Sequence, residues 1–238
     1  MSDREEPAKL HGRRHGRPLR PGLKRLIDAE LPKVELRLPE EGAELRLNSL
    51  FDPPPEALWL EIGFGGGEHL AAQAEANPRV GFIGAEVFVN GIASLLRQAR
   101  DRGLNNIRVL TEDARLLLAR LPEGSLGRVF LLFPDPWPKR RHNKRRFIQP
   151  ETLDALARAM APGAEFRVAT DDAGYLRWIL RHLLADPRFE WTAQRAADWR
   201  ERPEGWPPTR YEGKAIAQGR RPTYLTFVRC ARTAHETP

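Results

Sequence analysis

The chain has 238 residues, enough for one domain with a sizeable core, and its 39 lysines and arginines against 32 acids give a net charge of +7 that favours a polyanionic partner. A single cysteine, Cys230, excludes an internal disulfide framework and a metal site built from several cysteines, so no metal is expected. No apolar stretch is long enough to span a bilayer, and the basic N-terminus lacks an apolar signal core, so we expect a cytoplasmic protein without a membrane partner.

The N-terminal segment differs in composition from the rest of the chain. Residues 1–25 carry eight lysines or arginines against three acids, with glycine and proline throughout, which is typical of a flexible arm. The arm could contact nucleic-acid phosphates or remain a solvated tail, and its composition favours neither. Residues 26–238 are expected to form a single domain, in which 23–31 begins a short helix and 32–55 is an irregular connector.

Strands and helices alternate from residue 57 onward. The pattern predicts strands over 58–62, 80–87, 106–110, 127–133 and 165–170, and helices over 68–76, 89–102, 114–121, 150–160 and 174–185. Such alternation predicts a doubly wound α/β fold with a mostly parallel sheet. Two later strands, over 189–194 and 223–230, are separated by an irregular loop and suggest an antiparallel edge strand in a seven-stranded sheet.

An acidic residue stands at or just after the carboxyl end of each of the first five strands. These residues are Glu61, Glu86, Asp113, Asp135 and Asp171. Ligands of such sheets bind beyond the carboxyl ends of the strands, so the five acids predict a binding site there. Each acid could instead cap the helix that follows it, and this alternative is strongest for Asp113.

A glycine-rich turn follows the first strand. Its alternate glycines are Gly63, Gly65 and Gly67. Glu68 occupies the place where a dinucleotide-binding turn has glycine, and its carboxylate would oppose a pyrophosphate at the helix N-terminus. The turn therefore favours a phosphate-free ligand such as S-adenosylmethionine. Glu86 lies 23 residues beyond Gly63, where an acid binds ribose hydroxyls, and Asp113 could accept from the adenine amino group.

Residues 133–146 form the most distinctive stretch of the chain. Asp135 stands between two prolines that restrict the backbone, next to Trp137. Six lysines or arginines follow within residues 139–146, and no acid occurs from 136 to 150. A run of charges is usually a solvated face, but the stiff acidic turn before this run favours a strip that binds an anion. Trp137 could stack on a base or pack beneath the turn.

These motifs resemble those of the tRNA (guanine-N7-)-methyltransferases over about residues 55–230. The resemblance rests on the segments 61–67, 84–87, 133–146, 169–171 and 209–214. It implies a Rossmann-like class I methyltransferase fold. It also implies transfer of a methyl group from S-adenosylmethionine to N7 of the guanine at position 46, in the variable loop of tRNA.

The resemblance extends to individual residues. With the glycine turn, the implied cofactor contacts are Glu61, Gly63, Gly65, Gly67, Glu86, Asp113 and Asp135, and Asp135 is also the implied catalytic residue. The implied substrate contacts are Lys139, Arg141, His142, Asn143, Lys144, Arg145, Arg146, Asp171, Thr209, Arg210, Tyr211 and Glu212. The loop 199–221 is interpreted as a substrate-side lid, and His69 as a surface or packing residue of the first helix after the glycine turn.

The implied chemistry needs alignment more than proton transfer. Guanine N7 carries an in-plane lone pair and no proton, so a strong general base is unnecessary, and positioning alone can supply about 7–11 kcal/mol. Our hypothesis is that Asp135 orients the guanine or stabilises the positive charge that develops on it. The target base should be splayed out of the folded RNA.

Two other functions stay open. A methyltransferase acting on an exocyclic amine of another RNA base would carry a similar proline-rich motif after the fourth strand. A catalytically inactive RNA-binding module of the same fold is also conceivable, although such a module would not need acids in the pocket. The sequence does not distinguish a monomer from a homodimer.

Overall fold

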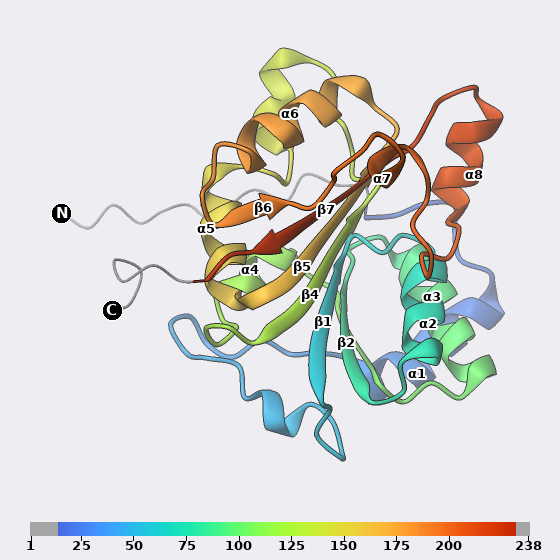
Figure 1. The fold of residues 1–238 in the computed structure, drawn as a ribbon. Helices are drawn as coiled ribbons and strands as arrows, with labels where there is room; N and C mark the ends of the chain where they lie inside the picture. Colours follow the sequence, from blue (N-terminus) through green and yellow to red (C-terminus); the bar gives the residue numbers. More distant parts are fainter. Residues whose placement is uncertain (1–13, 232–238) are drawn as a thin grey trace.

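Seven strands form one twisted sheet in the computed structural model, which describes residues 14–231 (Figure 1). The strands are β1 (Ala57–Ile62), β2 (Val80–Ala85), β3 (Ile107–Leu110), β4 (Leu126–Leu132), β5 (Met160–Thr170), β6 (Phe189–Trp191) and β7 (Thr223–Arg229). Their order across the sheet is β3-β2-β1-β4-β5-β7-β6. Neighbours among β1 to β5 are parallel, which confirms the expected doubly wound α/β fold.

The antiparallel strand lies inside the sheet rather than at its edge. β7 pairs antiparallel with both β5 and β6, so β6 occupies the edge and runs in the same direction as β5. The register places Thr223 opposite Thr170. β7 therefore begins at the carboxyl edge of the parallel strands, where the predicted site lies, and residues 192–222 connect it to β6, whose last residue, Trp191, pairs with Phe227.

Helices account for most of the connections. They are α1 (Pro21–Val34), α2 (Glu68–Ala76), α3 (Val89–Arg102), α4 (Ala114–Leu118), α5 (Pro150–Ala159), α6 (Ala173–Leu183), α7 (Ala197–Arg200) and α8 (Arg210–Ala217), with 3-10 helices η1 (Leu47–Ser49) and η2 (Arg140–Arg145). α3 ends at Gly103, whose φ of 67° makes the left-handed cap that glycine permits. α5 begins with a proline and a capping box between Gln149 and Thr152.

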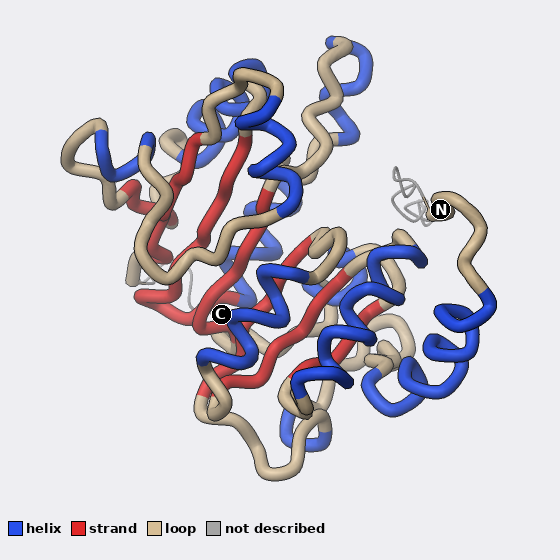
Figure 2. The backbone as a smooth tube through the Cα atoms, turned by 90° about the vertical axis from the view of Figure 1, so that its right-hand side faces the viewer, coloured by secondary structure: helices blue, strands red, loops and turns tan. Residues whose placement is uncertain are grey.

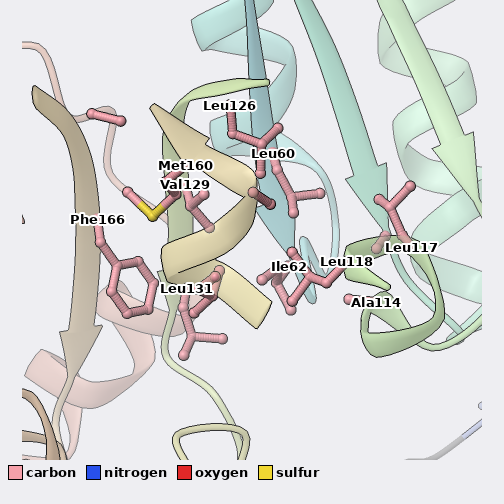
Figure 3. Packing of buried hydrophobic residues seen from close by; sticks show 14 of the residues in the cluster. Leu60, Ile62, Ala114, Leu117, Leu118, Leu126, Val129, Leu131, Met160 and Phe166 are labelled. Carbon is pink, nitrogen blue, oxygen red and sulfur yellow. The ribbon is translucent and has the colours of Figure 1, made fainter. Parts of the chain in front are cut away.

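The strands alternate their side chains between two covered faces. Leu60 and Ile62 point to one face, where α4, α5 and α6 pack on the sheet, and Glu61 between them points to the other. Figure 3 shows this packing, with Val129 and Leu131 of β4 beside the two β1 residues. Burial of each such side chain stabilises the fold by roughly 1.5–3 kcal/mol.

The second face is covered in two halves. α1, α2 and α3 pack on β1, β2 and β3, and Figure 2 shows these helices lying along the strands. Over β4, β5 and β7 the cover is Trp206, from the segment 192–222, which packs on Phe130 and Tyr224. The segment predicted as an irregular loop thus contains α7 and α8 and forms part of the core.

Other differences from the expectations concern boundaries. α1 extends beyond the expected 23–31, because Pro21 is pre-organised for a helix start and Pro32 falls only in the last turn. Pro162 and Gly163, expected to end the preceding helix, lie in a bulged part of β5 between Met160 and Glu165, where the register shifts.

Part of the expected arm is docked on the domain. The Val89 amide donates to the Arg14 carbonyl (3.0 Å), the Gly16 amide donates to Asn90 Oδ1 (2.9 Å), and Asn90 Nδ2 donates to the Arg17 carbonyl (2.9 Å). The expected boundary at residue 25 falls inside α1, and residues 1–13 of the arm lie outside the described residues. Between residues 14 and 231, every helix is too short or too polar to cross a membrane.

Candidate active site

The glycine turn after β1 has an unusual backbone. Gly63, Gly65 and Gly67 have φ values of 67°, 56° and 76°, in the left-handed region that glycine adopts without strain. Gly91, in the first turn of α3, packs directly on this turn, because a Cβ at Gly91 would lie 2.0 Å from the Gly65 carbonyl oxygen. The turn is therefore a tight, fixed loop against which a ligand can approach the backbone.

Glu86 follows β2 and is tied to the glycine turn. Its Oε2 accepts from the Gly65 amide (2.8 Å), and its Oε1 accepts from the amides of Val87 (2.8 Å) and Phe88 (2.9 Å). Burial raises the pKa of the Glu86 carboxyl above its ordinary value of 4.5, these amides lower it, and the negative charge of Asp135 raises it again. β2 and β4, which Glu86 and Asp135 follow, flank β1 in the parallel sheet, so both residues stand at its carboxyl edge.

Asp135 sits in a strained turn at the end of β4. Phe133 and Trp137, which flank Pro134-Asp135-Pro136, have φ values of 51° and 45°, a region that bulky residues rarely enter. The Phe133 amide still donates to the Ala169 carbonyl (2.8 Å), so the turn begins from a fixed sheet position. Asp135 is exposed at the rim, yet burial of its carboxyl group raises its pKa above the ordinary 3.8. Such strain is characteristic of functional sites.

Glu61 and His69 form a buried pair next to the glycine turn. His69 Nδ1 lies 2.7 Å from Glu61 Oε2, and the two side chains are 2% and 4% exposed. Of the two interpretations of His69, the surface residue is wrong and the packing residue is confirmed, although the pairing with Glu61 was not expected. Its position in the first turn of α2 brings the ring directly over the buried face of β1. A single histidine at a helix start carries no pattern that would have shown this.

The start of α8 covers the glycine turn. The ring of Tyr211 lies against Gly65, where an added Cβ would be 2.6 Å from Tyr211 Cε2. Thr209 and Glu212 form a capping box, with the Glu212 amide donating to Thr209 Oγ1 (3.1 Å) and the Thr209 amide donating to Glu212 Oε2 (3.3 Å). The Tyr224 hydroxyl donates to the same, buried carboxylate. The first turn of α8 is therefore rigidly held.

A small pocket lies between α8 and the end of β1. It is lined by Glu61, Gly63, Phe64, Glu68, His69, Leu132, Phe133, Thr209 and Tyr211. Its volume is about 10 Å³, room for about one water. The segment 192–222 is also fastened to α2, since Gln73 Nε2 donates to the Gly205 carbonyl (2.7 Å). Tyr211 and the start of α8 therefore limit the room in this pocket.

Two of the five predicted acids are paired with arginines. Asp113 caps α4, accepting from the Arg115 amide (2.9 Å), and it binds the Arg115 guanidinium, with Nη2 at 2.5 Å from Oδ2. The capping alternative for Asp113 is thus realised. Asp171 pairs with Arg220 Nη1 (2.7 Å), which ties the end of β5 to the end of the segment 192–222.

The basic run forms an exposed strip on η2, with one exception. The fully exposed cations are Lys139, Arg140, Arg141 and Lys144, while His142, Asn143 and Arg145 are half-buried. Trp137 packs against η2, with the Arg145 guanidinium 4.9 Å above its ring and the His142 ring edge-on at 5.9 Å.

Arg146 does not belong to that strip. It is 7% exposed, donates from Nε to the Pro136 carbonyl (2.9 Å), and lies over the rings of Tyr175 (5.2 Å) and Trp178 (5.0 Å). The expectation that Arg146 binds RNA is corrected by this placement. Its guanidinium instead supports the turn that carries Asp135.

The chemistry of these residues fits the cofactor that the resemblance implies. Glu86 Oε2 accepts one hydrogen bond and keeps a second acceptor position, which suits a ribose hydroxyl. Within 4 Å of the position of a Gly63 Cβ there is no heavy atom, so the backbone there is open to a ligand. Glu61 supplies a buried carboxylate for a cation at the other end. S-adenosylmethionine has both a ribose and an ammonium group, which are the groups that these two carboxylates suit.

Comparison with known proteins agrees with these features. A family model described as "Putative methyltransferase" matches residues 55–225. A tRNA (guanine-N(7)-)-methyltransferase of Rhodospirillum rubrum is 55% identical over 231 residues, covering 96% of this chain and 91% of that protein. The protein of the same name from Azorhizobium caulinodans is 50% identical over 229 residues, covering 96% and 98%.

Solved structures of low identity share the fold. The 16S rRNA methyltransferase KamB superposes with a TM-score of 0.56 at 19% identity, covering 74% of this chain and 89% of that one. An rRNA methylase from Streptococcus thermophilus superposes with a TM-score of 0.50 at 13% identity, covering 74% and 88%. At these identities the likeness concerns the α/β fold alone.

Proposed function

The chain belongs to the family of the tRNA (guanine-N(7)-)-methyltransferases, and from this we propose that it transfers the methyl group of S-adenosylmethionine to N7 of a guanine in tRNA, at position 46 of the variable loop. The relatives of 55% and 50% identity bear the name of the reaction, and they match almost the whole chain. Position 46 rests on the family resemblance of the motifs.

The observation that carries the proposal is the placement of Asp135. The strained turn holds this carboxylate at the end of β4, the strand beside β1 and its glycine turn. The exposed cations of η2 begin four residues further on, at Lys139. One carboxylate thus stands between a cofactor site and an RNA-binding strip, which is the position a residue needs in order to act on a base.

S-adenosylmethionine supplies the methyl group as an electrophilic sulfonium. The chain holds the guanine so that N7 lies in line with that group, and it needs no general base, because N7 carries no proton. Asp135 accepts hydrogen bonds from the N–H groups of the guanine and stabilises the positive charge that the ring acquires. Preorganised groups of this kind usually make the largest single contribution to catalysis.

The RNA is bound by charge and by the segment 192–222. Lys139, Arg141 and Lys144 are exposed and bind phosphates, which makes affinity depend steeply on salt. Arg210 and Tyr211 lie at the start of α8, above the glycine turn, and contact the splayed-out nucleotide once the segment has moved.

The test is methyl transfer from labelled S-adenosylmethionine to an unmodified tRNA transcript, compared between wild type and Asp135→Ala. Nuclease digestion and mass spectrometry locate the product, and a transcript with adenine at position 46 is the matched control. Label as 7-methylguanosine at position 46, lost in the variant and in the control transcript, supports the proposal. Methylation of another atom or position contradicts the target. Absence of transfer by a protein that binds tRNA favours an inactive binding module.

A further inference from the structure

His69, the partner of Glu61, has no role in the chemistry described so far. His69 Nδ1 contacts Glu61 Oε2 at 2.7 Å, which leaves Oε1 of the carboxylate for another partner. Both residues line the small pocket under Tyr211, beside Gly63. Burying a carboxylate costs free energy unless a partner donates to it. His69 is that partner of Glu61, so it affects how Glu61 binds any further group.

The other nitrogen of His69 points to a polar ligand. Nε2 is buried and has no hydrogen-bond partner among residues 14–231. A few other buried polar side-chain atoms of the described residues also lack a hydrogen-bond partner. Among them, only His69 Nε2 belongs to a residue that lines the pocket. An unpaired buried polar atom costs about 1–3 kcal/mol, and native structures keep few of them. This one is explained if the pocket is completed by a group with several N–H donors.

The ring of His69 is held in a fixed orientation. Phe130 of β4 contacts it edge-on at 4.7 Å between ring centroids, and Trp206 does so at 6.4 Å. Trp206 belongs to the segment 192–222, and Gln73, one turn further along α2, is bonded to Gly205 of that segment. His69 is therefore packed between the acid of β1 and the segment that covers the pocket.

We propose that His69 is a positioning residue that acts through Glu61. Its Nδ1–H donates to Oε2 and fixes the carboxylate so that the free oxygen accepts from the ammonium group in the amino-acid part of S-adenosylmethionine. The terminal torsion of a glutamate is otherwise broad, so an unsupported carboxylate would present its oxygens in many directions. The inference rests on the proposed function only for the identity of the cofactor, and not for the RNA target.

The test measures discrimination between two ligands. One is S-adenosylhomocysteine, and the other is its deaminated analogue, which carries hydrogen in place of the ammonium group. Titration calorimetry gives the ratio of their dissociation constants for wild type, His69→Leu and His69→Asn. The leucine variant removes the donor to Glu61, whereas the asparagine amide places an N–H near the position of Nδ1.

Wild type is expected to prefer S-adenosylhomocysteine, and His69→Leu to lose roughly tenfold of that preference, the size of one hydrogen bond to a charged group. His69→Asn should restore most of it. A purely structural role would weaken both ligands equally and leave the ratio unchanged. An unchanged ratio, or a failure of asparagine to restore it, overturns the proposal, as does a wild type that does not distinguish the two ligands.

A matched control and a second readout complete the design. His182→Leu removes another helix histidine, whose Nδ1 contacts the Trp178 carbonyl (2.8 Å) on α6, and it should leave the ratio as in wild type. In a Glu61→Gln background, His69→Leu should change the ratio no further, because the residue through which it acts is already neutral. Wild type that binds neither ligand would contradict the cofactor of the proposed function instead.

Discussion

Gly91 stands in direct contact with the carbonyl group of Gly65, and a Cβ at residue 91 would lie 2.0 Å from that oxygen. The first turn of α3 therefore supports the glycine turn from behind. The opposing atom belongs to the backbone, so no side chain can rotate away to relieve a clash.

Replacing Gly91 by alanine should damage both stability and cofactor binding. Overpacking costs typically about 1–3 kcal/mol, and any relief displaces Gly65 and the amide that Glu86 accepts. We expect at least tenfold weaker binding of S-adenosylhomocysteine by calorimetry and a lower free energy of unfolding in urea. The control is Gly22→Ala in α1, where no heavy atom lies within 4 Å. Gly91→Ala with wild-type stability and affinity would show that the contact is relaxed in solution.

Asp135→Asn should lower the rate of methyl transfer without lowering the stability of the fold. Loss of the carboxylate is expected to lower single-turnover methyl transfer by roughly 10²–10³-fold. Because burial raises the pKa of Asp135 in the folded state, its ionised form opposes folding above that pKa. The neutral variant should therefore unfold at a slightly higher temperature at neutral pH, and the difference should vanish below the ordinary carboxyl value of 3.8. A variant that is less stable at neutral pH would contradict this sign.

The pH dependence of the transfer step should have an acid limb only. Asp135 must be ionised, and its raised pKa means that the charge is lost at a higher pH than for an ordinary aspartate. The lone pair of N7 is available without deprotonation, so the single-turnover rate should be level from about pH 7 to about pH 9. A rate that rises tenfold per pH unit through that range would indicate base catalysis. Asp135→Asn should lack the acid limb in its residual rate.

Truncation of Arg146 should lower the stability of the fold, whereas truncation of Arg141 should weaken tRNA binding. Arg146→Met removes the donor to Pro136 and the contacts with two aromatic rings, and it should destabilise the fold by about 2–4 kcal/mol in urea. Arg141→Ala is exposed and should change stability by less than about 0.5 kcal/mol. For tRNA binding, Arg141→Ala should reduce the slope of log affinity against log salt by about 1. Equal effects of both variants on that slope would place Arg146 on the RNA.

The fold was largely predictable because the strongest periodic signals decide it. α2 and α3 begin and end at the residues expected, since a glycine stands before the first and after the second. α8 was missed although Thr209 and Glu212 have the spacing of a capping box. The surrounding prolines and glycines concealed that signal.

The parts of the site that depend on residue type were predictable. The parts that depend on the direction in which a side chain points were not. The glycine turn contacts Glu86, and Asp135 follows the neighbouring strand β4, because parallel strands deliver their carboxyl ends to one edge. Arg146 is turned inward whereas Arg141 and Lys144 are exposed, and a run of like charges gives no indication of which side faces the core. The contacts of His69 and Gly91 join elements far apart in sequence, and no local pattern encodes them.

The position of β7 has a consequence for how this protein can diversify. Residues 192–222 start on β6 and finish on β7, two hydrogen-bonded neighbours, with Trp191 at the end of β6 paired to Phe227 and β7 beginning at Thr223. A segment whose two ends are fixed in neighbouring strands can be lengthened, shortened or exchanged as a cassette while the strands keep their register. Choice of RNA target can therefore evolve in this segment separately from the methyl-transfer machinery on β1, β2 and β4.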